Sequence, residues 1–148
     1  MIFEEYYKKY KSYIKIKKEI NELENKKINL MSMVDVQAIP PKDGTGGTNS
    51  KADKMLTYAA ELEEVEIELE KNKKIIRELK KQLKDKETDL RESKEVLDNI
   101  YLYKYIEKLK WYQICTKIGY EKTKTYDLIN EVDEILRKIK IAEKNGKK

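Results

Sequence analysis

Residues 111–128, WYQICTKIGYEKTKTYDL, contain the pattern around which the rest of the chain is interpreted. Apolar residues recur there at helical spacing and are interrupted once, which predicts two short helices joined by a tight turn. Gly119 lies at the interruption, where a positive φ is expected because glycine has no Cβ to clash. Cys115 supplies the small residue needed where the two helices cross. The inner side of this helix-turn-helix is predicted to consist of Ile114, Ile118, Tyr120, Thr125 and Leu128.

The composition indicates long, largely exposed helices. Charged residues make up 41% of the 148 residues, with only five glycines and two prolines. Eleven tyrosines against one phenylalanine fit a shallow core, since tyrosine can cover an apolar seam and keep its hydroxyl in water. We predict an all-α protein with four parts. They are an N-terminal amphipathic helix (1–30), a flexible connector (31–50), a long coiled-coil-like helix (51–92) and a C-terminal helix-turn-helix domain (93–148).

Several classes of protein are excluded by what the sequence lacks. With no histidine and a single cysteine, neither a metal site nor an internal disulfide is expected. No buried cluster of carboxylates offers an acid–base pair, so we expect no enzyme activity, cofactor or small-molecule substrate. No apolar run is long enough to cross a bilayer, and glutamates interrupt the basic face of the first helix. We therefore predict a cytoplasmic protein that does not bind membranes.

The basic excess lies in the last third of the chain. Residues 101–148 carry 12 basic and 7 acidic side chains, which gives them a charge of +5, equal to the net charge of the whole protein. The excess coincides with the helix-turn-helix, and a positively charged module of this kind favours a polyanionic partner. Double-stranded DNA is the predicted partner.

A strict seven-residue repeat marks the long helix. Such a row makes a coiled-coil seam, and polar residues in the companion row, Asn72 and Lys86, would select the register or the partner. We predict a homo-oligomer, most simply a dimer. Whether the row faces the N-terminal helix or a second subunit is left open by the sequence. The residues assigned to oligomerisation are Leu62, Leu69, Ile76, Leu83 and Leu90.

The second helix of the helix-turn-helix is the predicted recognition helix. If Thr125 and Leu128 point inward, the side chains available to the major groove are Lys122, Thr123, Lys124, Tyr126, Asp127 and Asn130. Lys124 suits a guanine edge and Asn130 an adenine edge. Lys108, Lys110 and Lys117 lie on the approach to the turn and are assigned to phosphates, which position a protein without specifying sequence.

The span YIEKLKWYQICTKIGYEKTKTYDLINEVDEIL, residues 105–136, resembles the C-terminal helix-turn-helix of phage transcriptional regulators related to region 4 of sigma factors. The matching positions are Tyr105, Ile106, Leu109, Trp111, Ile114, Cys115, Ile118, Gly119 and Tyr120, followed by Thr125, Tyr126 and Leu128. The upstream layout, with its TNSKADKM segment, is similar to that of late-operon activators of the RinA and ArpU type. The resemblance implies an oligomeric, sequence-specific DNA-binding activator of late phage or prophage genes in a bacterial host cell, with RNA polymerase as a further candidate partner.

Two alternatives remain at the level of sequence. The coiled coil alone would suit a structural or interaction protein whose C-terminal helices only cap it. A small-terminase-like component of DNA packaging would combine an oligomeric ring with a helical DNA-binding module.

Overall fold

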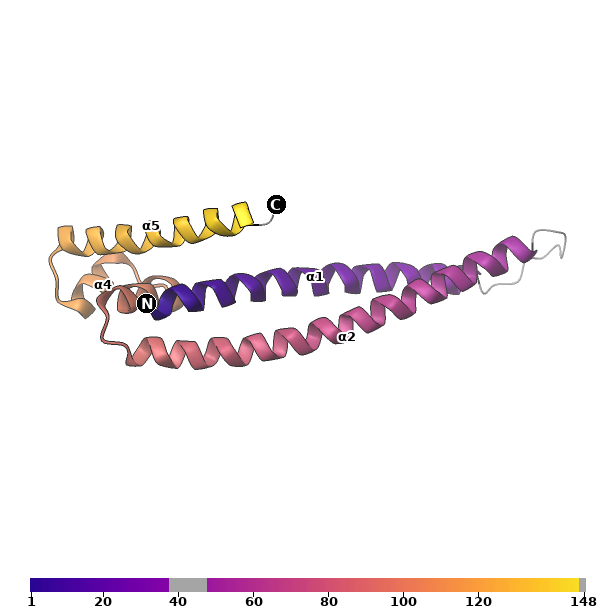
Figure 1. The fold of residues 1–148 in the computed structure, drawn as a ribbon, viewed down its shortest axis with the longest axis horizontal. Coiled ribbons are helices and arrows are strands. Elements are labelled where there is room, and N and C mark those ends of the chain that lie inside the picture. The colour runs from indigo at the N-terminus through magenta and orange to yellow at the C-terminus, as the bar shows by residue number, and fades with distance from the viewer. Residues whose placement is uncertain (38–47, 147–148) are drawn as a thin grey trace. The chain divides into compact units, whose positions relative to one another are not determined.

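The computed structural model describes the backbone of residues 1–37 and 48–146 and the side chains of residues 1–34 and 54–146; within these ranges it is helical and has no strand. The all-α prediction is confirmed. The elements in chain order are α1 (Ile2–Gln37), α2 (Thr48–Glu92), α3 (Val96–Tyr101), the π-helical turn η1 (Leu102–Ile106), α4 (Trp111–Ile118) and α5 (Lys122–Gly146) (Figure 1).

The elements form two compact units, which are described separately. The hairpin unit comprises Tyr13–Glu78. The core unit comprises Met1–Ser12 together with Leu79–Lys148, so it joins the start of the chain to its last third. Two long helices alone can bury only a narrow seam, whereas the core unit brings several helices around one centre.

The hairpin unit is a seam between α1 and α2. Ile20 and Leu30 of α1 are buried against Val65 and Leu69 of α2. An ion pair between Lys27 and Glu66, with 3.7 Å between Nζ and Oε1, lies beside this seam. The partly buried residues packed against it are Ile16, Leu23, Tyr58, Leu62 and Ile76. Three members of the heptad row, at positions 62, 69 and 76, therefore pack within the chain.

The ends of the two long helices differ from the prediction. α1 continues to Gln37 and α2 begins at Thr48, so residues 31–37 and 48–50 of the predicted connector are helical. On the α1 side the reason is packing, because Leu30 is buried and Val34 is half-buried one turn later, which extends the apolar stripe beyond residue 30. Residues 38–47 of the predicted connector lie outside the described residues.

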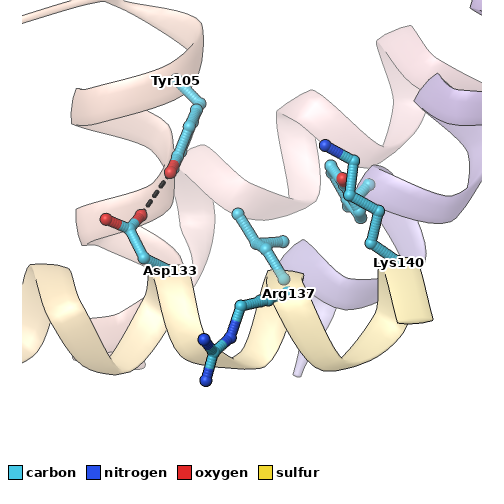
Figure 2. Close-up of a pocket in the computed structure, with 6 residues that line it drawn as sticks. Tyr105, Asp133, Arg137 and Lys140 are labelled. Atoms are coloured by element: carbon cyan, nitrogen blue, oxygen red, sulfur yellow. Dashed lines mark hydrogen bonds between the residues drawn. The ribbon is translucent and has the colours of Figure 1, made fainter. Parts of the chain in front are cut away.

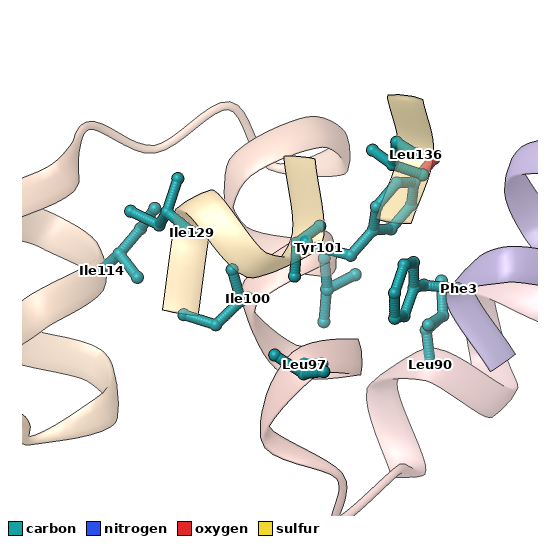
Figure 3. Close-up of a cluster of buried hydrophobic side chains, with 10 residues drawn as sticks. Phe3, Leu90, Leu97, Ile100, Tyr101, Ile114, Ile129 and Leu136 are labelled. Carbon is teal, nitrogen blue, oxygen red and sulfur yellow. The ribbon is translucent and has the colours of Figure 1, made fainter. Parts of the chain in front are cut away.

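The core unit is built around side chains from six elements (Figure 3). Leu97 and Ile100 of α3 lie at its centre, as the apolar pattern of the segment after Ser93 predicts, and Tyr101, which that pattern does not predict, is buried beside them. Two further members were not predicted to belong here: Phe3 from α1 and Leu90 from the end of α2 are both fully buried. The other buried members are Leu102, Ile114, Ile129, Val132 and Leu136. Segments far apart in sequence thus complete the core of the C-terminal module.

A buried carboxylate joins the two ends of the core unit. Asp98 is fully buried, and its Oδ1 accepts a hydrogen bond from the Phe3 backbone N–H at 3.0 Å. Its Oδ2 accepts a hydrogen bond from the Ser93 hydroxyl at 2.8 Å. The first N–H groups of a helix lack partners within the helix, and a negative charge there is favourable to the helix dipole. Asp98 therefore caps α1 although it lies 95 residues away.

The apolar pattern of residues 96–109 predicts one continuous helix after Ser93, and the structure differs from this. α3 passes into η1, and the helix ends with hydrogen bonds from Glu107 N–H to Leu102 O (2.9 Å) and from Leu109 N–H to Tyr103 O (2.8 Å). Lys108 has φ +55°, a left-handed conformation that a helix interior excludes. This break turns the chain into α4.

Candidate nucleic-acid interface

The turn between α4 and α5 has the predicted geometry. α4 ends at Ile118, α5 begins at Lys122, and residues 119–121 connect them. Gly119 has φ +80°, and its N–H donates to Cys115 O at 2.8 Å, which closes the end of α4. The Thr125 hydroxyl donates to Glu121 O at 2.9 Å, so this buried polar side chain is satisfied within α5.

Most of the predicted inner side of the two helices is confirmed. Ile114 and Thr125 are buried, and Ile118 and Leu128 are half-buried and pack against the core. Tyr120 was wrongly placed inside, because it is 38% exposed. It belongs to the turn, where helical periodicity no longer fixes the direction of a side chain. Cys115 is half-buried.

A side-chain cap fixes the start of α4. The Lys110 N–H donates to Gln113 Oε1 at 2.9 Å, which satisfies one of the N–H groups left free at a helix N-terminus. Lys110 itself has an extended backbone, and its side chain is exposed. The approach to α4 is therefore ordered by a side chain of α4 itself.

All six residues assigned to the major groove are exposed on α5. Thr125 and Ile129, four residues apart on the same helix, are buried, so α5 presents one side to the core and the opposite side to solvent. The exposed residues are Lys122, Thr123, Lys124, Tyr126, Asp127 and Asn130. They occupy the first turns of α5, which is the part of a recognition helix that contacts base edges.

The lysines assigned to phosphates are exposed but differ in their surroundings. Lys108 and Lys110 lie in the segment between η1 and α4. Lys117 Nζ lies 3.8 Å from Glu107 Oε2 and 5.3 Å from the centroid of the Tyr103 ring. Its charge is therefore partly compensated within the protein. Lys110 has no comparable acidic neighbour among the ion pairs found in the described residues.

An aromatic cluster at the start of both helices was missed by the sequence interpretation. The rings of Trp111 and Tyr126 are stacked, with centroids 5.4 Å apart, and Tyr112 meets Trp111 edge-on at 5.8 Å. Lys122 Nζ lies 4.9 Å from the Trp111 centroid, and Lys124 Nζ lies 4.1 Å from that of Tyr120. Trp111 and Tyr126 flank the turn in the sequence, which was the available signal. This cluster holds the beginning of α5 to the beginning of α4.

The residues assigned to oligomerisation are used within the single chain to different degrees. Leu69 is 4% exposed and Leu90 is fully buried, whereas Leu62, Ile76 and Leu83 are half-buried. Oligomerisation stays a prediction. The exposed apolar side chains of the hairpin unit that would be available to a second copy include Ile14, Ile28, Leu56 and Ile67.

Comparison with known proteins gives no relative from which a site can be transferred. No family model, curated protein or solved structure matches this chain. Within residues 1–37 and 48–146, no helix combines the length and apolar character needed to span a membrane. The described residues also contain no group of three or more Cys, Asp or Glu side chains arranged to hold a metal ion.

Substitution of Gly119 tests the turn. A Cβ at this position would meet no atom within 4 Å, so any cost comes from the positive φ alone. We expect Gly119→Val to lower the free energy of unfolding by about 1–3 kcal/mol, measured by urea denaturation followed by circular dichroism. Gly119→Asn is the matched control and is expected to cost less, because asparagine adopts the left-handed conformation more readily. Equal stability of the valine variant and the wild type would contradict the turn described here.

Proposed function

We propose that this chain is a sequence-specific transcriptional regulator that binds double-stranded DNA through α4 and α5. The observation that supports it best is the exposed row on the first turns of α5, directly after the Gly119 turn, backed by a core on the opposite side. A rigid scaffold under exposed polar side chains is what base recognition requires. By its resemblance to late-operon regulators, the proposed role is activation of phage or prophage genes.

The charge distribution indicates that different residues would attract the phosphates and read the bases. On the first turns of α5, Lys122 and Lys124 are balanced by Asp127 and Glu131, so this part of the helix adds no net charge. Attraction to the phosphate backbone must then come from the neighbouring lysines, with Lys108 and Lys110 the best placed. The neutral part of α5 is suited to reading bases, a task in which uniform attraction to phosphates gives no selectivity.

The experiment begins with selection of bound fragments from random and genomic DNA, followed by affinity measurements on the enriched site. Lys124→Ala and Asn130→Ala are each expected to weaken binding to that site by about 1–3 kcal/mol and to leave binding to nonspecific DNA unchanged. Lys110→Ala should lower the affinity for all DNA sequences equally, and it should reduce the slope of log affinity against log salt concentration by about one. Lys117→Ala should reduce the slope less, because Glu107 already compensates its charge.

Lys144→Ala is the control, since Lys144 is exposed in the last turn of α5, far along the helix from the turn. If Lys124 and Asn130 variants fold normally and bind the enriched site like the wild type, the recognition surface has been misassigned. If no fragment is enriched, the regulator proposal is wrong.

A structural or interaction protein is the second candidate, favoured by one observation. Ile67 on α2 and Ile28 on α1 are 64% and 63% exposed in the hairpin unit, and isoleucines so exposed can contribute to a protein interface. This alternative predicts self-association that is lost in Ile28→Lys and Ile67→Lys variants, with no preference for any DNA fragment.

A further inference from the structure

Five tyrosines of the core unit gather around one hollow. Their rings and the side chain of Ile106 line a cavity of about 320 Å³, formed by the first turns of α1 together with α3 and η1. The tyrosines are Tyr6, Tyr7, Tyr10, Tyr101 and Tyr105. None of the roles given above to the core or to α5 requires this concentration of aromatic rings.

The rings form two walls that meet at a corner. Tyr6 and Tyr10 are nearly parallel, with centroids 6.3 Å apart and 9° between the planes. Tyr101 and Tyr105 form the other wall, with centroids 5.1 Å apart and 31° between the planes. Tyr6 meets Tyr101 edge-on at 66°. Tyr101 is only 2% exposed and is stacked on Phe3, with centroids 5.5 Å apart, so it forms the buried floor of this corner. Tyr10 and Tyr105 are 42% and 39% exposed and are accessible to a planar ring system, which stacks on tyrosine whatever its pattern of hydrogen-bonding groups.

A second cavity, of about 280 Å³, adjoins the first and shares Tyr7 and Tyr105 with it. Its other wall is α5, which contributes Asp133, Leu136, Arg137 and Lys140 (Figure 2). The Lys140 side chain rises from α5 toward the cavity, whereas the Arg137 guanidinium points away from Tyr105. Arg137 binds Glu134 instead, with 2.6 and 2.8 Å between its Nη2 and the two carboxylate oxygens.

The second cavity has a positive side. Asp133 is compensated by Lys104, with 2.7 Å between Oδ2 and Nζ, and also accepts a hydrogen bond from the Tyr105 hydroxyl. Burial raises the pKa of Tyr101, and burial together with the hydrogen bond to Asp133 raises the pKa of Tyr105. Both phenols therefore stay protonated and add no negative charge. Lys140 is the lining cation that no carboxylate compensates among the ion pairs of the described residues.

We propose that the two adjoining cavities bind a nucleoside monophosphate, with the base on the tyrosine walls and the phosphate at Lys140. Aromatic faces next to a cation are complementary to a planar ring joined to an anion. Lys140, which no carboxylate compensates among the ion pairs of the described residues, disfavours a cationic ligand on this side. The ligand is bound and not converted, so the proposal adds no enzyme activity, and it holds whether or not α5 binds DNA.

Isothermal titration calorimetry on the full chain tests this with three probes. Adenosine 5′-monophosphate is expected to bind at millimolar concentration. Adenosine, which lacks the phosphate, and ribose 5-phosphate, which lacks the base, are each expected to bind at least about fivefold more weakly. Absence of binding by the monophosphate would overturn the proposal, and so would equal affinity for adenosine, because Lys140 would then have no role.

Variants locate the binding. Tyr10→Leu removes an exposed ring of the first wall and is expected to lower the affinity for the monophosphate by about fivefold or more. Lys140→Gln is expected to lower this affinity by about threefold. Tyr112→Leu and Lys144→Gln are the matched controls, an exposed aromatic and an exposed lysine outside both cavities, and should bind like the wild type. If a control variant loses as much affinity as its partner, or if Lys124→Gln abolishes binding, the nucleotide lies elsewhere and the proposal is wrong. DNA affinity, measured separately, reports on the proposed function alone.

Discussion

Replacing Ile100 with alanine is expected to lower the free energy of unfolding by about 2–5 kcal/mol. Ile100 is fully buried at the centre of the core unit, between side chains of α4 and α5 on one side and the end of α2 on the other. Truncation removes three methyl or methylene carbons from contact with several elements at once. Because α3 lies within a cluster of buried side chains from six elements, its surroundings can collapse little into the space left.

The measurement is urea denaturation followed by circular dichroism, with Ile141→Ala as the control. Ile141 lies on α5 and is 52% exposed, so the same truncation there should change stability by less than about 0.5 kcal/mol. A pair of variants with equal stability would show that the centre of the core unit has been assigned to the wrong side chains.

Replacing Asp98 with alanine is expected to lower the free energy of unfolding by about 2–4 kcal/mol. The change removes the acceptor for the Phe3 N–H, which is buried, and for the hydroxyl of Ser93, which is half-buried. It also removes the negative charge at the start of α1. Asp98→Asn keeps one acceptor and should cost less than the alanine variant.

Hydrogen exchange of the Phe3 amide checks the mechanism, because its protection should fall in Asp98→Ala more than that of amides in the middle of α1. Asp127→Ala is the control, since Asp127 is an exposed aspartate on α5. If Asp98→Ala and Asp127→Ala are equally stable, Asp98 does not cap α1.

The sequence was informative where neighbours along the chain decide the structure. Helical spacing and a glycine at one position were enough to predict the turn at Gly119 and the burial of Ile114 and Thr125. Tyr120 could not be predicted, since its direction is set by the turn after a residue with φ +80°. The exposure of Lys124 and Asn130 follows from the same spacing, because residues opposite a buried stripe point to solvent.

Helical periodicity does not predict which segments far apart in the sequence contact one another. Phe3 has an apolar position on its helix like any other, and nothing local shows that it enters the core formed by α3 and α5. The same holds for Asp98, which reads as one of many surface carboxylates until the Phe3 N–H is placed beside it. The heptad row indicated a seam, but only the structure shows that Leu69 is covered by α1 and Leu90 by the core unit.

The geometry around Tyr105 depends on the number of residues in the π-helical turn η1. A π-helical turn closes its hydrogen bond over one residue more than an α-helical turn, as the bond from Glu107 N–H to Leu102 O does here. Deleting one residue from η1 would allow an ordinary α-helix and would rotate α3 against the segment leading to α4 by about 100°. Tyr105 would then leave Asp133. Insertion or deletion of a single residue in η1 would thus remove the Tyr105–Asp133 contact, as a substitution of Tyr105 would. Homologues that are one residue shorter in η1 are expected to lack this contact and the two adjoining cavities.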